Sequence, residues 1–291
     1  MEIGVNILNF GPHATPDGLD GWARFAEDAG LGFAMISDHV AVTPDVAEQY
    51  PAPFWDPFTT LAWLAGRTSR IRLGTTVTVL PYRHPLQTAR VTANLDRFSG
   101  GRLIFGVGVG WSRAEYEALG VPFERRGALT DEYLDVVTRA WTADELEYAG
   151  HRVATGPRPA QTPRPPVWVG GNSPAALRRA VRFGDAWHIL FVPPDRLRDE
   201  GLPALRAAAD ASGRPVPALA PRIQLNLTDA PLNEDRPPGH GTLDQVRRDV
   251  EAYRVLGATH LLLDTYLGDP AAHRPPAQDQ AMIAELTATL T

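Results

Sequence analysis

The sequence predicts an α/β fold, a (β/α)8 TIM barrel with loops inserted at the C-terminal ends of its strands. Short apolar segments typical of buried strands alternate with amphipathic segments of helical spacing. The crossovers between them are short, and the length of 291 residues suits one large barrel. Because no linker interrupts this pattern, we expect a single domain over residues 1–291. A doubly wound sheet is the alternative.

Four strands and three helices are expected in the first half of the chain. The strands cover residues 2–9, 33–37, 71–80 and 103–109, and the helices cover residues 17–30, 56–66 and 85–98. Asp56 followed by Pro57 is typical of an N-cap and a first helical position. Residues 40–55 are rich in proline, and we expect them to form an inserted loop.

The second half repeats the alternation. Strands are expected over residues 167–169, 185–190, 223–227 and 260–264, and helices over residues 129–140, 173–184, 196–211, 242–256 and 278–290. Ser173 is the expected N-cap of its helix, and Thr242 with Gln245 matches a capping box. The proline-rich residues 144–166 suit an excursion over the surface.

The fourth strand carries glycines on one face only. Strand side chains alternate, so Gly106, Gly108 and Gly110 share a face opposite Phe105 and Val107. Such a bare face permits close approach of a packed helix or of a flat ligand. We expect the glycine face to be the outer one, packed against a helix.

The composition excludes several classes of function. The net charge of −6 argues against a nucleic-acid partner. The absence of cysteine excludes disulfides, thiolate catalysis and cysteine-ligated metals. All 28 basic residues are arginine, which excludes a Schiff-base or P-loop lysine. With no secretory pattern at the N-terminus and no apolar run near the ~20 residues of a membrane span, we expect a cytoplasmic protein without a membrane partner.

The active site of such a barrel lies at the C-terminal ends of its strands. That rule selects Asn9, Ser37, Asp38, His39, Thr75 to Tyr82, Val109 to Ser112, Gly170 to Ser173, Trp187, His188, Asn226 and Asp264. His39 is the best-placed group for proton transfer near neutral pH, although a lone histidine is more often structural. His188 is placed similarly, and Asp38 either caps its loop or orients a neighbour. Trp111, Trp187 and Tyr82 either pack at the rim or contact a flat heterocycle.

The loop Gly170, Gly171, Asn172 and Ser173 is the strongest local motif. Two glycines let the backbone approach a ligand, and the following helix N-terminus favours a phosphate. An ordinary turn with an N-cap is the alternative. The same segment also resembles a nucleophile elbow, but Pro174 has no N–H to offer an oxyanion. The Rossmann fingerprint fails, and no convincing metal cluster is found, so we expect no metal.

Several longer motifs, in order, resemble the luciferase-like flavin and deazaflavin oxidoreductases, in particular the branch that uses coenzyme F420. They are Ile36 to Val40, Pro53 to Phe58, Arg70 to Thr75, Leu80 to Pro85, Leu95 to Trp111, Asp131 to Tyr133, Trp168 to Ser173 and Gly184 to His188. The match covers about residues 1–190 well and the remainder only in outline.

The resemblance implies that a deazaflavin or flavin ring lies across the strand ends and exchanges hydride. It implies that His39 is the catalytic histidine and that a non-prolyl cis peptide joins Thr76 and Val77. It also implies that Gly170 to Ser173 hold the cofactor phosphate. The residues expected to contact the cofactor are Ser37, Asp38, Thr76, Val77, Val109, Gly170, Gly171, Asn172, Ser173, Trp187 and His188. The family also suggests a homodimer.

Two departures bear on the substrate. The sugar-phosphate dehydrogenases of the family carry an acid where this chain has Val109, and a tryptophan where it has Thr43. We therefore expect the acid partner of the histidine to be missing and a sugar phosphate not to be the substrate. Without lysine, any anion of the substrate or cofactor tail must be held by arginine, backbone or hydroxyl groups.

The sequence thus predicts an F420-dependent oxidoreductase acting on a small organic molecule. An FMN-dependent monooxygenase that incorporates molecular oxygen is the alternative. A non-catalytic barrel that only binds the cofactor is a more distant one, and a hydrolase comes last.

Overall fold

The structure is a computed structural model, and it describes residues 1–290. Its strands are β1 (Glu2–Asn6), β2 (Phe33–Ile36), β3 (Arg72–Thr75), β4 (Thr78–Val79), β5 (Leu103–Gly108), β6 (Glu145–Tyr148), β7 (His151–Ala154), β8 (Val167–Gly170), β9 (Ala186–His188), β10 (Ala218–Leu219), β11 (Arg222–Gln224), β12 (Asn226–Leu227), β13 (His240–Gly241) and β14 (His260–Asp264). Its α-helices are α1 (Pro16–Asp28), α2 (Pro44–Ala47), α3 (Pro57–Ala65), α4 (Pro85–Phe98), α5 (Arg113–Ala118), α6 (Arg126–Thr142), α7 (Pro174–Phe183), α8 (Pro194–Arg196), α9 (Leu202–Ser212), α10 (Leu243–Val255) and α11 (Pro276–Thr287).

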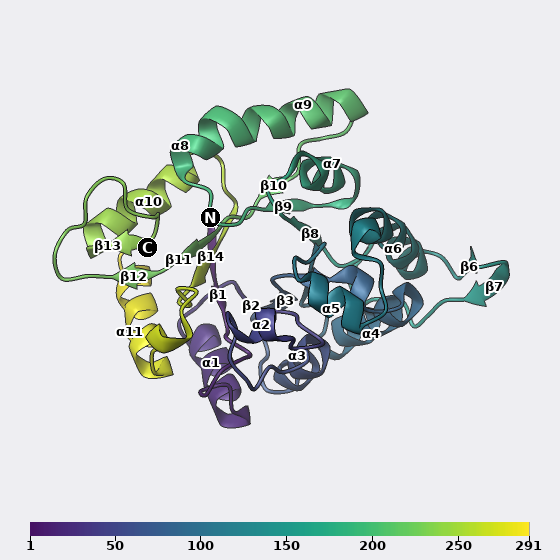
Figure 1. The fold of residues 1–291 in the computed structure, drawn as a ribbon, viewed down its shortest axis with the longest axis horizontal. Coiled ribbons are helices and arrows are strands. Elements are labelled where there is room, and N and C mark those ends of the chain that lie inside the picture. Colours follow the sequence, from purple (N-terminus) through teal and green to yellow (C-terminus); the bar gives the residue numbers. More distant parts are fainter. Residues whose placement is uncertain (291) are drawn as a thin grey trace.

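The main sheet is parallel and closes on itself, which confirms the predicted barrel (Figure 1). Its strand order is β10, β9, β8, β5, β3, β2, β1, β14 and β11, with β4 also paired to β5. β10 and β11 are consecutive parts of one extended segment, broken only at Ala220 and Pro221. Because β10 pairs with β9 and β11 pairs with β14, this segment joins the two ends of the sheet.

The long helices surround the barrel, and α1, α3, α7 and α10 among them begin at a side-chain cap. Side chains of Thr15, Asp56, Ser173 and Thr242 accept hydrogen bonds from the first turns of α1, α3, α7 and α10. The capping box at α10 forms in full, as the sequence predicted. Among the described residues, no helix is long and apolar enough to cross a membrane.

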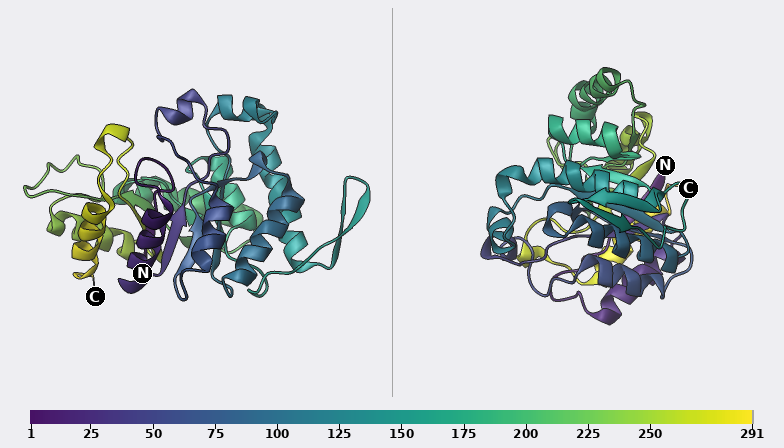
Figure 2. Two further views of the ribbon diagram at one scale, coloured as in Figure 1. Left: turned by 90° about the horizontal axis from the view of Figure 1, so that it is seen from below. Right: turned by 90° about the vertical axis from the view of Figure 1, so that its right-hand side faces the viewer.

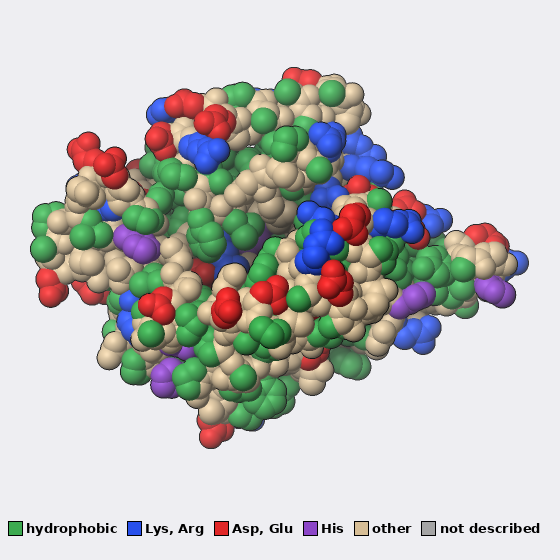
Figure 3. Space-filling view, in the orientation of Figure 1, with side chains coloured by type: hydrophobic (Ala, Val, Ile, Leu, Met, Phe, Trp, Pro, Cys, Tyr) green, Lys and Arg blue, Asp and Glu red, His purple; other side chains and the backbone are tan. Residues whose placement is uncertain are grey.

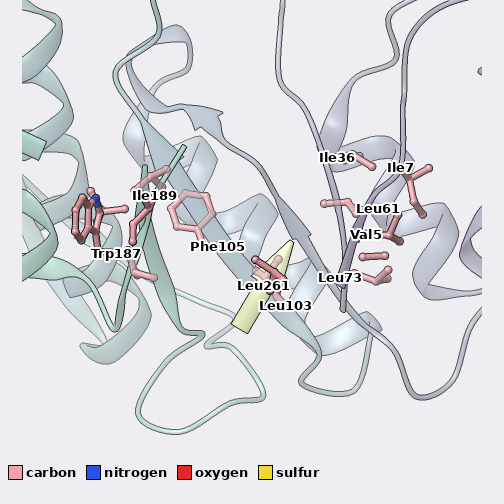
Figure 4. Close-up of a cluster of buried hydrophobic side chains, with 14 of the residues drawn as sticks. Val5, Ile7, Ile36, Leu61, Leu73, Leu103, Phe105, Trp187, Ile189 and Leu261 are labelled. Carbon is pink, nitrogen blue, oxygen red and sulfur yellow. The ribbon is translucent and has the colours of Figure 1, made fainter. Parts of the chain in front are cut away.

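The core has two layers because strand side chains alternate in direction. An outer layer fills the space between strands and helices and includes Val5, Leu73, Leu103 and Phe105 (Figure 4). A smaller inner layer fills the barrel itself and contains Phe33, Met35, Ile104, Trp168, Ala186, Ala220 and Leu262.

The glycine face of β5 points into the barrel, so the expected outward orientation was wrong. Phe105 packs against Trp141 of α6, with ring centroids 5.4 Å apart, so the large side chains lie outside. A Cβ placed on Gly106 would lie 1.8 Å from the carbonyl oxygen of Thr75, and one on Gly108 would lie 2.5 Å from Cγ2 of Val77. The neighbouring strand therefore occupies the space that these glycines leave.

A bulge in the neighbouring strand explains this filling. Gly74 of β3 pairs with Ile104, whereas Thr78 of β4 pairs with Val107, so one extra residue lies on the β3–β4 side. An unpaired residue in one strand makes that strand bend locally. The residues between Gly74 and Thr78 bend inward, where only glycine in β5 leaves room.

Segments extend from the barrel at its C-terminal face and at its side. The segments carrying α2 and α5 lie on the face at the C-terminal ends of the strands, hereafter the barrel mouth (Figure 1). The antiparallel hairpin β6–β7 projects from the side of the barrel, as expected of a surface excursion (Figure 2).

We predict that Gly106→Ala lowers the free energy of unfolding by about 3 kcal/mol or more, because the added Cβ has no free space and its nearest neighbour is backbone. Gly21→Ala is the matched control. Gly21 lies in α1 with no atom near its added Cβ, so alanine there should stabilise the protein by about 0.5–1 kcal/mol. Chemical denaturation measures both, and equal stabilities of the two variants would contradict this account of β5.

Candidate active site at the barrel mouth

A buried histidine–glutamate pair lies at the barrel mouth. His39 follows β2, and Glu115 lies on α5, which follows β5. Nδ1 of His39 is 2.6 Å from Oε2 of Glu115, and the hydroxyl of Tyr82 donates to the same oxygen over 2.9 Å. Oε1 accepts the backbone N–H groups of Val40 and Ala41 at 2.6 and 3.0 Å. Four donors therefore surround one carboxylate.

The charge of Glu115 determines which nitrogen of the His39 imidazole carries the proton. Burial favours a higher pKa for Glu115, but hydrogen bonds from His39, Val40 and Ala41 outweigh it and hold the pKa below its usual value. An ionised carboxylate only accepts hydrogen bonds, so the proton must lie on Nδ1 of His39. Nε2 has no hydrogen-bond partner within residues 1–290 and is not sealed from solvent. It is the nitrogen available for chemistry.

Glu115 was not among the predicted site residues, and the acid of the acid/base pair was expected to be missing because Val109 occupies its position. Val109 indeed carries no carboxylate, and its carbonyl oxygen accepts the hydroxyl of Tyr116. Glu115 instead reaches His39 from the helix that follows. The signal was the pattern Ser112-x-x-Glu115, which is typical of a capping box.

Only half of that capping box forms. Oγ of Ser112 accepts the backbone N–H of Glu115 at 3.0 Å, but the Glu115 carboxylate turns to the β2 loop rather than back to its own helix. The hydroxyl of Ser112 donates to Asp45 over 2.6 Å and ties α5 to the α2 segment. Thr43 also bonds Asp45, so it shapes this segment and does not face His39.

Aromatic rings surround the imidazole. The centroids of Tyr50, Phe54 and Trp111 lie 5.2, 5.3 and 5.9 Å from that of His39. Only 7% of the His39 side chain remains exposed. Tyr82 and Trp111, expected at strand ends, do lie here.

Asp38 takes a structural position. Its carboxylate receives two hydrogen bonds from Arg83, at 2.7 and 2.8 Å, and one from the backbone N–H of Val79. The side chain is fully buried. Asp38 therefore joins the ends of β2 and β4, which matches the local role weighed from sequence and leaves no oxygen for the expected cofactor contact.

Ser37 is positioned by Asn9. The side chain of Asn9 accepts the backbone N–H of Ser37 at 3.0 Å and donates to its carbonyl at 2.9 Å. Ser37 is half-buried and makes no side-chain hydrogen bond within the described residues. Its hydroxyl thus remains available at the mouth.

The bulge between β3 and β4 forms the floor of the mouth. The peptide bond from Thr76 to Val77 is cis, at the position expected from the family resemblance. Nη1 of Arg222 donates to the carbonyl oxygen of Thr76 at 3.0 Å, while Arg222 pairs with Asp264 at 2.6 Å. Figure 3 shows this face hollowed near its centre, with a basic group in the hollow.

His188 lies beneath the floor, and Trp187 lies on the outer face of β9, so neither lies on the floor itself. His188 is fully buried between the Thr76 hydroxyl, 2.9 Å from its Nε2, and the carbonyl of Ala220, 2.7 Å from its Nδ1. Trp187 is also buried and donates to the carbonyl of Gly171. This placement argues against the direct cofactor contact expected for both, since neither presents surface at the mouth. They support the floor and the glycine loop.

The glycine loop, Gly170 to Ser173, leads into α7 as expected, but the side chains of Asn172 and Ser173 already bond other parts of the protein. Asn172 bonds the backbone of Leu190 through both its amide atoms, and Oγ of Ser173 accepts the N–H of Ala176. Gly171 has φ +108°, a conformation that favours glycine. A Cβ on Gly170 would lie 2.9 Å from Val77. An anion here would bind the N–H groups of Ser173 and Ala175, since Pro174 has no N–H and that of Ala176 is already bonded.

No group of three or more His, Cys, Asp or Glu side chains within residues 1–290 is arranged to hold a metal ion. The polar groups at the mouth are instead joined in pairs, His39 with Glu115 and Arg222 with Asp264.

Comparisons with known proteins agree with this geometry. Residues 1–236 match the luciferase-like monooxygenase family. An uncharacterized protein of Mycobacterium tuberculosis is 37% identical over 233 residues, which cover 74% of this chain and 80% of that protein. The F420-dependent hydroxymycolic acid dehydrogenase of Mycobacterium tuberculosis is 30% identical over 229 residues, covering 76% of this chain and 62% of that enzyme.

Solved structures share the fold. A monooxygenase from Streptomyces bottropensis superposes with a TM-score of 0.77 at 23% identity, covering 99% of both chains. An F420-dependent secondary alcohol dehydrogenase in complex with an F420–acetone adduct gives a TM-score of 0.76 at 16% identity, covering 98% of this chain and 97% of that one. At these identities the matches establish the fold alone.

We predict that His188 makes the protein less stable as the pH falls from 6.5 to about 4. Burial lowers the pKa of His188 from 6.5 to about 4, so across this window the unfolded chain binds a proton that the folded chain does not. The loss is on the order of 3 kcal/mol and stops below the folded pKa. Denaturation of the wild type and of His188→Asn as a function of pH measures it, and the variant should lack this slope.

His151→Asn, in the exposed strand β7, is the control and should keep the wild-type slope. Parallel losses of stability in the wild type and in His188→Asn would contradict the assignment.

Proposed function

The chain belongs to the luciferase-like monooxygenase family, and from this premise we propose that it is an F420-dependent oxidoreductase that exchanges hydride with a small organic substrate. As a member of this family, the chain is an enzyme of the oxidoreductase and monooxygenase type. The observation that carries the proposal is the His39–Glu115 pair. A histidine oriented by an anionic carboxylate is suited to move the proton that accompanies hydride transfer at a hydroxyl or carbonyl group.

His39, Glu115 and Tyr82 have different roles in moving the proton. Bound F420 would supply the hydride acceptor or donor. Nε2 of His39 accepts the proton of an alcohol during oxidation and returns it to the oxygen in the reverse direction. The negative charge of Glu115 stabilises the imidazolium that forms, and the hydroxyl of Tyr82 keeps that carboxylate in place.

The floor and the glycine loop fit such a cofactor. Val77 is raised into the barrel over Gly108 and Gly170, so it offers an apolar surface on which a flat ring can pack. The N–H groups of Ser173 and Ala175 have no acceptor among the described residues and suit the phosphate, with Gly171 shaping the approach. Ser37 and Thr76 lie near the same floor, whereas Asp38, Trp187 and His188 would act through the residues that they support.

A basic groove favours F420 over FMN. The groove, about 470 Å³ in volume, runs between α7 and α9 and is lined by Arg178, Arg179, Arg182 and Arg214. Figure 3 shows basic side chains gathered near α7. Arg178 and Arg182 have no acidic partner among the described residues, whereas Arg179 pairs with Asp131. F420 carries an acidic polyglutamate tail that FMN lacks, and this chain has no lysine to hold it.

An FMN-dependent monooxygenase is the alternative, because the same floor and phosphate loop suit a flavin. A barrel that only binds the cofactor would not require a buried anion to orient His39. The hydrolase reading is disfavoured by Pro174, which starts α7 and has no N–H for an oxyanion.

We predict that the purified chain binds F420 more tightly than FMN and that added salt weakens F420 binding more. Arg178→Ala combined with Arg182→Ala should weaken F420 binding about tenfold or more and leave FMN binding unchanged, because surface cations act through screened attraction to the tail. Fluorescence titration of the wild type and of the double variant with each cofactor measures the dissociation constants. Arg70→Ala, an exposed arginine before β3, is the control. Tight FMN binding without F420 binding would overturn the cofactor assignment.

We predict that His39→Ala lowers kcat by about 10²–10⁴-fold while the dissociation constant of the cofactor stays within about twofold. Glu115→Gln should lower kcat less than His39→Ala does, because the imidazole remains but the anion that orients it is lost. Steady-state kinetics over a range of pH measure both effects. Unchanged turnover in His39→Ala would show that another group moves the proton.

A further inference from the structure

Tyr50 presents an unpaired hydroxyl at the barrel mouth. The hydroxyls of Tyr82, Tyr116 and Tyr266 all donate to protein acceptors. The Tyr50 hydroxyl has no partner within residues 1–290, although its ring is half-buried against that of His39. It is also not sealed from solvent. A phenol placed beside the proposed proton carrier is therefore free to bind a ligand.

The loop that carries Tyr50 is held firmly, so the free hydroxyl is not a consequence of a loose segment. The N–H of Gly11 donates to the carbonyls of Pro51 and Pro53 at 2.8 and 2.9 Å. The Tyr266 hydroxyl donates to the carbonyl of Gln49, just before Tyr50. The Tyr50 ring itself packs between Phe10 and Tyr266, with centroids 5.1 and 5.9 Å away.

The phenol of Tyr50 lies near enough to Arg222 and Asp264 to be influenced by their charges. Burial raises the pKa of its phenol, with a smaller raising effect from Asp264 and an opposing effect from Arg222. The ring therefore extends from His39 toward the Arg222–Asp264 pair, and its hydroxyl remains protonated as a hydrogen-bond donor.

The rim above these groups is apolar. Val40, Trp111 and Phe191 are 43%, 42% and 46% exposed, and each lies at or just beyond the C-terminal end of a barrel strand. Phe191 has φ +52°, which is uncommon for a bulky residue, and its ring lies over Arg222 at 5.5 Å. Fixed strain of this kind is concentrated at sites that contact ligands.

The two arginines that bond the floor and Asp38 are themselves paired with acids and are not free to bind an anionic substrate. Arg222 is neutralised by Asp264 and Arg83 by Asp38, while Glu115 adds a negative charge beneath His39. A neutral substrate with a hydrocarbon body and one oxygen function satisfies both the rim and the two free polar atoms.

We propose that the Tyr50 hydroxyl and Nε2 of His39 together bind the oxygen of a neutral, apolar secondary alcohol or ketone, whose hydrocarbon chain lies against Val40, Trp111 and Phe191. This rests on the hydride-transfer function proposed above. In oxidation the substrate C–H bond would break, and its electron pair would leave with the hydrogen as hydride to a bound deazaflavin or flavin. The O–H proton passes to Nε2 of His39 and the C=O bond forms. Tyr50 donates a hydrogen bond throughout and loses no proton.

The test measures binding and turnover separately. Calorimetry of the purified chain, with and without cofactor, measures the affinity for 2-heptanone. Kinetics of the cofactor-loaded enzyme compare 2-heptanol with 6-hydroxyheptanoate, which has the same chain length and a terminal carboxylate. Tyr50→Phe removes only the hydroxyl, and Tyr133→Phe, on the outer helix α6, is its matched control.

We expect Tyr50→Phe to weaken 2-heptanone binding by about three- to tenfold and to lower kcat/KM for 2-heptanol to the same extent. Cofactor affinity should not change, and Tyr133→Phe should match the wild type. Phe191→Ala should weaken binding of 2-heptanone but not of acetone. The wild type should prefer 2-heptanol to 6-hydroxyheptanoate by at least about tenfold.

The proposal is overturned if 2-heptanone does not bind the wild type, if Tyr50→Phe binds it equally well, or if the carboxylate is preferred. Binding of 2-heptanone that depends on Tyr50, without any alcohol turnover, would instead refute hydride transfer to alcohols and leave the oxygen site standing.

Discussion

The barrel mouth depends on one buried anion. The carboxylate of Glu115 accepts hydrogen bonds from His39, Val40 and Ala41 in the loop after β2 and from Tyr82 after β4, so two distant parts of the chain converge on α5. The side chains of His39 and Tyr82 are buried, and a buried donor left without an acceptor costs about 1–3 kcal/mol. The position of His39, its tautomer and the exposure of Nε2 all follow from this single set of contacts. The same hydrogen bonds to Glu115 therefore stabilise the mouth and orient the imidazole of His39.

The floor depends in turn on a mismatch between neighbouring strands. One extra residue between β3 and β4 turns Thr76 and Val77 inward, and the glycines of β5 and β8 provide the space. The polar groups that this bulge exposes are satisfied from below, by Arg222 and by the neutral imidazole of His188. A bulge that re-aims side chains beside a site is a common use of this irregularity. Here it separates the apolar side chain of Val77 from the hydrogen bonds that Arg222 and His188 make with Thr76.

The mouth is thus divided by chemistry. The two side chains with a free polar atom, His39 and Tyr50, lie between aromatic rings, and the rim around them is apolar. The unpaired arginines lie outside the barrel, beside α7. A cofactor with a charged tail and a substrate without charge would therefore be recognised by different parts of the molecule. Ion pairs within the mouth, Arg83 with Asp38 and Arg222 with Asp264, serve the protein's own architecture.

The sequence by itself determined the alternation of strands and helices, the helix starts at Asp56, Ser173 and Thr242, and the strand end that carries His39, because these are local patterns of period and capping. It could not determine the direction of the glycine face, which depends on a bulge in another strand. Nor could it assign Glu115, which lies 76 residues from His39 and whose side chain leaves its local capping contact for donors on a distant loop. Asp38 and Asn172 likewise looked free in sequence but are taken by Arg83 and Leu190. A polar side chain bonds to whichever of the donors and acceptors within its reach fits best. Folding decides which groups come within reach, so only the tertiary structure identifies the partner.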